Sequence, residues 1–270
     1  GERIFELCLA SANLTLPERQ RIVIYKNNSD GKGNSYGHHE NYLMERRLPF
    51  DQIVQGFAPF LVTRLIFAGA GKVGAENGAD PCHYQISQRA DFFESFIGLD
   101  TMAKRPIINT RDEPHADEEK YRRLHVIVGD SNMSEVATYL KVGTTAIVLA
   151  MIEDGFITRD LTLEDPVRAI KEISHDVTCR RRVRLKRGKE FSAIEIQREY
   201  LDLAREYYQD RERSPQVADL LEKWQYVLDQ LALDPMTLHR ELDWVIKHAL
   251  ITSYINRKGC SFDDQRVFML

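Results

Sequence analysis

Cysteine is scarce in this sequence, and long apolar runs are missing. The 270 residues include four cysteines without CxxC spacing: Cys8, Cys82, Cys179 and Cys260. Neither a disulfide framework nor a structural zinc site is indicated, and reduced, buried thiols are expected. No stretch approaches the roughly 18 uninterrupted apolar residues of a membrane span, and the first residues lack the layout of a signal peptide. We therefore expect a cytoplasmic protein with no membrane partner.

An excess of positive charge is also missing. With 37 Lys and Arg against 41 Asp and Glu, the net charge of -4 gives no global attraction to nucleic acid. The run from Arg180 to Arg187 is basic, but it lacks interleaved aromatic residues and is typical of a solvated face. Binding of an acidic protein partner there is the alternative. The segment 69–74 is not a P-loop, because Val73 follows Lys72 where Ser or Thr is required.

Hydrophobic periodicity divides the chain into a strand-rich part, 20–130, and a helix-rich part, 134–270. We expect strands that share one sheet at 21–25, 84–87, 107–110 and 124–129. We expect helices at 2–11, at 51–68, at 135–154 with an interruption near Gly143, from Pro166, at 192–208, from Pro215, and from Asp234 beyond Trp244, with a hairpin at 182–190. This order predicts an α+β domain whose sheet is covered on one face by helices and lines a cleft with the other.

Four polar residues follow a glycine-rich loop, in the segment His38-His39-Glu40-Asn41. On a strand, His39 and Asn41 would project to one face, and His38 and Glu40 to the other. That pairing suits a metal ligand beside a nucleotide contact. A solvated loop whose histidines have no function is the alternative.

A second cluster follows the strand expected at 107–110. Arg111 suits bidentate capture of a carboxylate or phosphate, and Asp112, Glu113 and His115 are candidates to hold it in place or to contact a cation. A salt-bridged surface turn is the alternative.

The third cluster lies on the last expected strand. Arg123 and His125 are two residues apart and should share one face, with Leu124 and Val126 on the opposite face. A hard divalent cation prefers oxygen ligands, so histidines here would only supplement carboxylates supplied elsewhere.

Together these segments resemble the family of Pup ligases and depupylases, which act on the prokaryotic ubiquitin-like protein Pup. The resemblance rests on 36–41, 107–117 and 121–127, and it extends from Lys26 to Trp244. It implies a glutamine-synthetase-like fold, with ATP and Mg²⁺ in a cleft on a curved sheet and Pup docked alongside.

The resemblance also implies roles for single residues. His39 and His125 would be metal ligands, and Asn41 and Arg123 would contact ATP. Arg111 would bind the phosphate or the C-terminal glutamate of Pup. Pup and pupylated proteins would be the partners.

The family contains two activities. A depupylase hydrolyses the side-chain amide of the C-terminal Gln of Pup and the isopeptide bond between Pup and lysine, whereas a ligase forms that bond. Segments 91–94, 98–101 and 137–145 look more like the depupylase, and 131–133 looks more like the ligase. We expect an ATP- and Mg²⁺-dependent Pup deamidase/depupylase, with a Pup–protein ligase as the alternative. A carboxylate–amine ligase for small amino acids and a non-catalytic protein-binding module are further alternatives.

The resemblance places residues 1–270 in the central part of a single large catalytic domain. In this family the catalytic aspartate and the magnesium-binding carboxylates belong to N-terminal motifs, which we expect to precede this chain. We expect a small C-terminal domain to follow it. The chain would then hold no catalytic residue and would be inactive alone.

Overall fold

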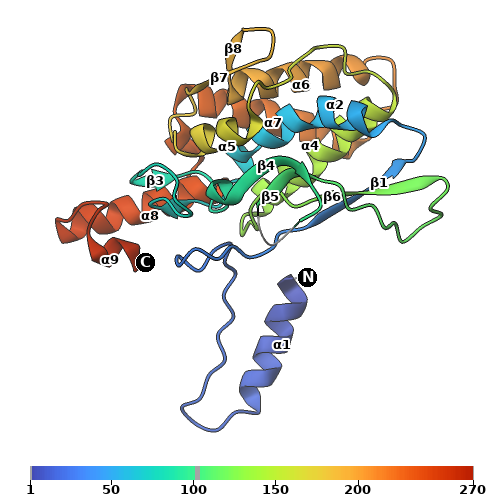
Figure 1. The fold of residues 1–270 in the computed structure, drawn as a ribbon. Coiled ribbons are helices and arrows are strands. Elements are labelled where there is room, and N and C mark those ends of the chain that lie inside the picture. Colours follow the sequence, from blue (N-terminus) through green and yellow to red (C-terminus); the bar gives the residue numbers. More distant parts are fainter. Residues whose placement is uncertain (1, 101–103, 270) are drawn as a thin grey trace.

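The computed structural model describes residues 2–100 and 104–269, and it contains both helices and strands (Figure 1). The helices are α1 (Glu2–Leu14), α2 (Phe50–Thr63), α3 (Leu65–Ala68), α4 (Glu135–Glu153), α5 (Pro166–Ser174), α6 (Ala193–Tyr207), α7 (Pro215–Leu233), α8 (Asp243–Lys258) and α9 (Gln265–Phe268), with 3-10 turns η1 (Ala90–Phe92) and η2 (Pro235–Leu238). The strands are β1 (Glu40–Glu45), β2 (Lys72–Val73), β3 (Tyr84–Gln85), β4 (Phe93–Gly98), β5 (Arg105–Asn109), β6 (Tyr121–Val126), β7 (Arg182–Arg184) and β8 (Glu190–Ser192).

Polar caps fix where the later helices begin. The Ser134 side chain accepts a hydrogen bond from the backbone of Ala137, and Asp165 caps α5 in the same way just before Pro166. Ser192 and Glu195 form a complete capping box at the start of α6. These caps confirm the helix starts expected from the sequence.

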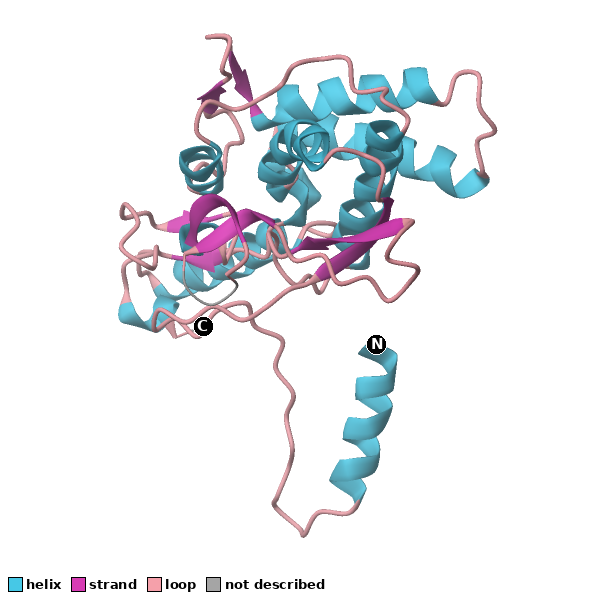
Figure 2. Cartoon of the chain, turned by 45° about the vertical axis from the view of Figure 1, so that its right-hand side comes forward, coloured by secondary structure: helices cyan, strands magenta, loops and turns pink. Residues whose placement is uncertain are grey.

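The strands form four separate pairs, so the expectation of one shared sheet is wrong. Among the described residues, β1 pairs with β6, β2 with β3, β4 with β5 and β7 with β8; only the β4–β5 pair is parallel. The expected strands at 84–87 and 107–110 pair with segments that the sequence pattern does not mark as strands, Lys72–Val73 and Phe93–Gly98. Helices α2, α4, α5, α6 and α7 lie on one side of β1, β4, β5 and β6 (Figures 1 and 2), which confirms the one-sided helical cover.

Three other expectations differ from the structure. Residues 21–25 are not a strand; Ile22, Val23, Ile24 and Tyr25 are 43–79% exposed, and no hydrogen-bonded ladder forms along them. Helix α4 is continuous at Gly143, where a Cβ would lie 2.6 Å from Leu220 Cδ2, so the glycine permits close packing of α7. The helix expected from Asp234 is divided into η2 and α8.

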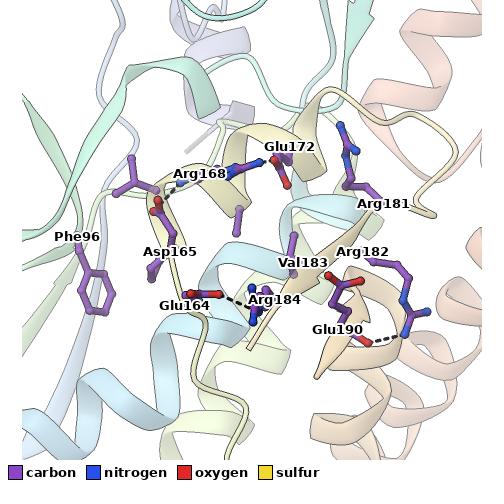
Figure 3. A pocket seen from close by; sticks show the side chains of 13 residues that line it. Phe96, Glu164, Asp165, Arg168, Glu172, Arg181, Arg182, Val183, Arg184 and Glu190 are labelled. Atoms are coloured by element: carbon purple, nitrogen blue, oxygen red, sulfur yellow. Dashed lines mark hydrogen bonds and ion pairs between the residues drawn. The ribbon is translucent and has the colours of Figure 1, made fainter. Parts of the chain in front are cut away.

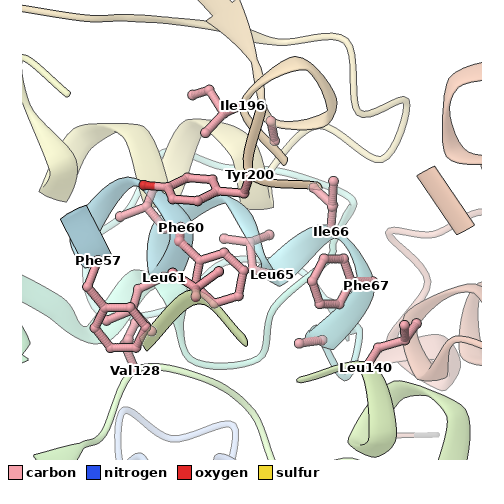
Figure 4. Packing of buried hydrophobic residues seen from close by; sticks show 14 of the residues in the cluster. Phe57, Phe60, Leu61, Leu65, Ile66, Phe67, Val128, Leu140, Ile196 and Tyr200 are labelled. Atoms are coloured by element: carbon pink, nitrogen blue, oxygen red, sulfur yellow. The ribbon is translucent and has the colours of Figure 1, made fainter. Parts of the chain in front are cut away.

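The apolar core lies within the helical layer. Phe60 of α2 packs edge-on against Tyr200, with ring centroids 5.4 Å apart, and against Trp224, at 6.2 Å (Figure 4 shows Phe60 and Tyr200). Burial of each such ring stabilises the fold by about 1.5–3 kcal/mol. Because α2 is anchored in this core, it forms a rigid support for the strands beneath it.

Helix α4 is the one described helix that is long and apolar enough to cross a membrane by length and composition alone. It packs against α2, α3, α6 and α7, and it buries the polar side chains of Lys141 and Thr144. Its apolar character is therefore accounted for by its place in the core.

Helix α1 lies apart from the rest of the chain in both views, and residues 15–27 connect it to the main body (Figures 1 and 2). It confirms the helix expected at the N-terminal end. Ile4, Phe5, Leu7 and Leu14 of this helix are 55–87% exposed.

Candidate functional site

The antiparallel pair of β1 and β6 places the predicted site residues side by side. Asn41 lies opposite His125, and Leu43 lies opposite Arg123. The Asn41 Oδ1 and His125 Nδ1 atoms are 3.1 Å apart, and the rings of His39 and His125 meet edge to face with centroids at 4.9 Å. The structure therefore brings His39, Asn41 and His125 together. Strand alternation predicts the shared face of His39 and Asn41, and the pairing of β1 with β6 adds His125.

The opposite face of β1 is buried and ionic. Glu40 accepts hydrogen bonds from Arg64 at 2.6 and 3.0 Å, and Arg64 also donates to Val128 O and Thr145 Oγ1. Burial pushes the pKa of Glu40 upward, but the Arg64 charge and hydrogen bonds from His38 and Arg64 outweigh it, so the pKa is well below its usual range. Glu40 is therefore a charged anchor beneath the site. The sequence offered one signal for it, a charged Arg64 inside an otherwise apolar helical segment.

A buried lysine extends this network. Lys141 Nζ lies 2.9 Å from His38 Nε2, and it donates to Asp130 O at 2.7 Å and to Asn132 Oδ1 at 2.8 Å. Burial lowers the pKa of Lys141 to about 8, and burial also lowers the pKa of His38. His38 thus faces away from His39, as predicted, and helps to fix the strand.

The loop after β5 contains the second predicted cluster. Asp112 binds Arg46 through both carboxylate oxygens, at 2.7 and 3.3 Å, and it accepts a hydrogen bond from the backbone of Arg123 at 3.2 Å. Glu113 accepts a hydrogen bond from Arg123 Nη2 at 2.7 Å. The expectation that Asp112 and Glu113 hold Arg111 is therefore wrong. The Arg111 side chain is exposed and makes no hydrogen bond or ion pair within the described residues.

Arginine charges surround the two histidines of the site. Burial, and then the charges of Arg89, Arg111 and other arginines, lower the pKa of His39. Burial, then His39, Arg123 and Arg111, lower the pKa of His125 to about 4. Both imidazoles are therefore neutral at pH 7 within a positive field, which favours an anionic ligand.

A cavity of about 650 Å³ opens beside His39. Its lining includes the loop 33–37, Phe92, Arg89 and Arg105. Arg89 is buried and donates to Ile127 O at 2.8 Å and to Ser35 Oγ at 3.0 Å. The sequence reasoning missed Arg89 and Arg105, because neither belongs to a recognisable motif and their approach to His39 depends on tertiary packing.

Gly37, in the loop before β1, leaves room for the ring of His39. A Cβ on Gly37 would lie 2.7 Å from His39 Nε2, closer than real Cβ contacts. The absent side chain lets the His39 ring fold back over the loop and face His125.

The described residues match a cation site only in part. His125 Nε2 is buried and has no hydrogen-bond partner among them, which suits an imidazole ligand. No group of three or more His, Cys, Asp or Glu side chains that could hold a metal occurs in the ranges 2–100 and 104–269. Because Mg²⁺ prefers oxygen ligands, His39 and His125 do not make a magnesium site by themselves.

A second cavity, of about 850 Å³, lies elsewhere, between α5 and the β7–β8 hairpin (Figure 3). Its arginines face acidic neighbours: Arg168 contacts Glu172 at 2.8 Å, and Arg184 contacts Glu164 at 3.2 Å. Within the basic run 180–187, Arg182, Arg184 and Arg187 each pair with an acidic side chain, which fits the solvated face expected there. Size alone does not make this cavity the functional site, since it lacks the buried polar groups found near His39.

The comparisons with known sequences agree on one family. A family model described as Pup-ligase protein matches residues 1–270. A depupylase of Acidothermus cellulolyticus is 54% identical over 96% of this chain and 52% of its own length. A Pup deamidase/depupylase of Mycobacterium tuberculosis is 46% identical over 100% of this chain and 54% of its own. A Pup--protein ligase of a Nocardioides species is 50% identical over 100% of this chain and 60% of its own.

Solved structures give the same result. The Pup ligase PafA in complex with ADP matches with a TM-score of 0.87 at 37% identity, covering 100% of this chain and 60% of that one. PafA in complex with Pup also has a TM-score of 0.87, at 38% identity, covering 100% and 55%. The chain thus spans little more than half the length of these relatives. Its fold and sequence show that it belongs to the Pup-ligase family, whose members include both ligases and depupylases.

Proposed function

We propose that this chain forms the nucleotide-binding and Pup-binding wall of a Pup deamidase/depupylase with a glutamine-synthetase-like fold. The observation on which the proposal rests is the arrangement on β1 and β6, where Asn41 contacts His125 and Arg123 lies on the same strand as His125. The two imidazoles are neutral at pH 7, and the surrounding arginines supply the positive charge that favours binding of a polyanion.

ATP is the proposed nucleotide, with Asn41 and Arg123 as its contacts. A guanidinium binds phosphate oxygens through two parallel hydrogen bonds, and a side-chain amide can donate to a base, sugar or phosphate. The ADP complex of PafA supports a nucleotide in this family. His39 and His125 are the proposed nitrogen ligands of the accompanying Mg²⁺. Its oxygen ligands would have to come from other groups.

Pup is the proposed protein substrate, and its terminal carboxylate or the transferred phosphate is the proposed ligand of Arg111. Arg111 is exposed, and its guanidinium makes no hydrogen bond with the described residues, so its N–H donors are open to an incoming anion. The complex of PafA with Pup supports this partner. We propose that the enzyme works in the bacterial cytoplasm.

The depupylase activity is proposed over the ligase activity. The segments 91–94, 98–101 and 137–145 look more like depupylases, whereas 131–133 looks more like a ligase. Thr101 lies outside the described residues. The identity of 54% to a depupylase and of 50% to a ligase is compatible with either activity.

The test uses the whole protein that contains this chain, with ATP and Mg²⁺. A depupylase releases Pup from a purified Pup–protein conjugate and converts a C-terminal Gln of Pup to Glu. A gel shift detects the release, and mass spectrometry detects the conversion. If the protein instead joins Pup ending in Glu to a substrate lysine and releases none, it is a ligase. The variant Arg123→Gln should reduce whichever activity is present, and Glu119→Gln, an exposed change in the same region, should not.

A further inference from the structure

Glu113 places a carboxylate against the positive wall of the site. Its Oε2 lies 2.7 Å from Arg123 Nη2, and the Glu113 side chain is 75% exposed while that of Arg123 is only 18% exposed. The pair therefore joins a solvent-facing carboxylate to a guanidinium that belongs to the site. Arg111 acts on the same carboxylate through its charge.

The loop that presents Glu113 is anchored one residue earlier. Asp112 binds the Arg46 guanidinium and the backbone N–H of Arg123, so the start of this loop is fixed to β6. Within the described residues, Arg123 is the one side chain that donates a hydrogen bond to the Glu113 carboxylate, which also interacts with the backbone N–H of Glu113 itself. Its side chain can rotate into solvent without breaking any of the Asp112 contacts.

A carboxylate and a phosphate make the same kind of bidentate contact with a guanidinium. An exposed carboxylate holds its partner weakly, because water and salt compete with it. A nucleotide phosphate has more charge and more acceptor oxygens than Glu113, so it can displace Glu113 from Arg123.

We propose that Glu113 is an internal stand-in for a ligand phosphate, which pairs with Arg123 in the free protein and leaves when a nucleotide phosphate binds. This inference rests on the proposed role of Arg123 in nucleotide binding. Glu113 then lowers the affinity for phosphate-bearing ligands and leaves the affinity for uncharged parts of the ligand unchanged.

The experiment measures binding of ADP, inorganic pyrophosphate and adenosine to the whole protein that contains this chain by isothermal titration calorimetry. Glu113→Gln keeps the shape of the side chain but removes its charge, and Glu113→Ala is a second variant with the same expected sign. ADP and pyrophosphate should bind about twofold to fivefold more tightly, the scale of one exposed ion pair. Adenosine should bind as before. Glu119→Gln, which removes an exposed charge from the same region, should change none of the three.

A double variant separates this inference from the proposed function. If the pair acts directly, Glu113→Gln gives no gain in a chain that already has Arg123→Gln. ADP binding that is weakened by Arg123→Gln but not tightened by Glu113→Gln overturns the stand-in alone. Equal tightening of adenosine and ADP also overturns it. ADP binding that is unaffected by Arg123→Gln, or absent from both the original chain and Glu113→Gln, overturns the nucleotide role of Arg123 and the stand-in with it.

Discussion

Asn41 and His125 lie opposite each other on paired strands, and 3.1 Å separates Asn41 Oδ1 from His125 Nδ1. Because an amide oxygen only accepts hydrogen bonds, this contact requires the proton on Nδ1 and leaves the lone pair on Nε2. The Nε2 atom is buried and has no partner among the described residues. Asn41 therefore holds His125 in the tautomer that can bind a cation or accept from a donor.

The first prediction concerns pH. The pKa of His125 is about 4 in the folded chain and about 6.5 in an unfolded one, so the folded state binds fewer protons between these values. The stability from neutral His125 is complete above about pH 6.5 and is lost as the pH falls toward 4. Between pH 7 and 5, the free energy of unfolding should fall by about 1 kcal/mol more in the original chain than in His125→Gln, after allowance for solvent screening.

Urea denaturation at several pH values measures this difference. His115→Gln is the matched control, because it replaces an exposed histidine in the same region by the same residue. Equal slopes for the original chain and His125→Gln would show that His125 takes up its proton in the folded state as easily as in the unfolded state.

The second prediction concerns the buried pair of Glu40 and Arg64. Their side chains are 7% and 1% exposed. Arg64→Met removes the cation and leaves a carboxylate buried without its main partner, so the free energy of unfolding should fall by about 3–5 kcal/mol. Arg47→Met, which breaks the exposed pair of Arg47 with Glu45, should change it by less than about 1 kcal/mol.

Guanidinium chloride denaturation measures both variants of this pair test. Titration of the folded variants with ADP is a second measurement. Loss of the ion pair between Arg64 and Glu40 should also disturb Asn41, which lies on the other face of β1. Similar stability losses in Arg64→Met and Arg47→Met would contradict the role of the buried pair.

The shared faces of the residues around 38–41 and 123–126 were predictable because they depend on strand alternation. The phase of 38–41 correctly placed His39 with Asn41 and Glu40 with His38, and the phase of 123–126 placed Arg123 with His125. The contact between Asn41 and His125 was not predictable, since no local pattern specifies which strand pairs with which across 84 residues. The Arg64 anchor needs the same long-range information.

The strand errors have a related cause. A β-branched run such as Ile22–Val23–Ile24 indicates strand propensity, but a strand exists only where another segment completes its hydrogen bonds. Conversely, Lys72–Val73 pairs with Tyr84–Gln85 although two residues give no periodic signal. Helices were predicted better because their hydrogen bonds and caps are local, as at Ser192.

The third prediction concerns Gly71, which lies in the segment 69–74 that resembles a phosphate loop. Gly71 has φ of +71°, and a Cβ there would lie 2.1 Å from Tyr84 Oη and 2.8 Å from Trp244 Cα. Gly78 has a similar φ of +70° but open space around it. Gly78→Ala should therefore cost about 1 kcal/mol from backbone strain alone, and Gly71→Ala should cost at least about 2 kcal/mol more because of the clash. Thermal unfolding followed by circular dichroism compares them, and equal losses would show that Tyr84 and Trp244 move aside without cost.

The last prediction separates the site from the basic run. Arg111→Gln removes an exposed guanidinium that has no described partner, so it should not lower stability, but it should weaken binding of Pup by about tenfold through loss of a charged hydrogen bond. Arg184→Glu and Arg187→Glu reverse charges that already face Glu164 and Asp160, and they should leave Pup binding within about twofold. Fluorescence anisotropy of labelled Pup with the whole protein measures both effects. If the charge reversals abolished binding and Arg111→Gln did not, the basic run would be the docking surface and the chain would act as a binding module.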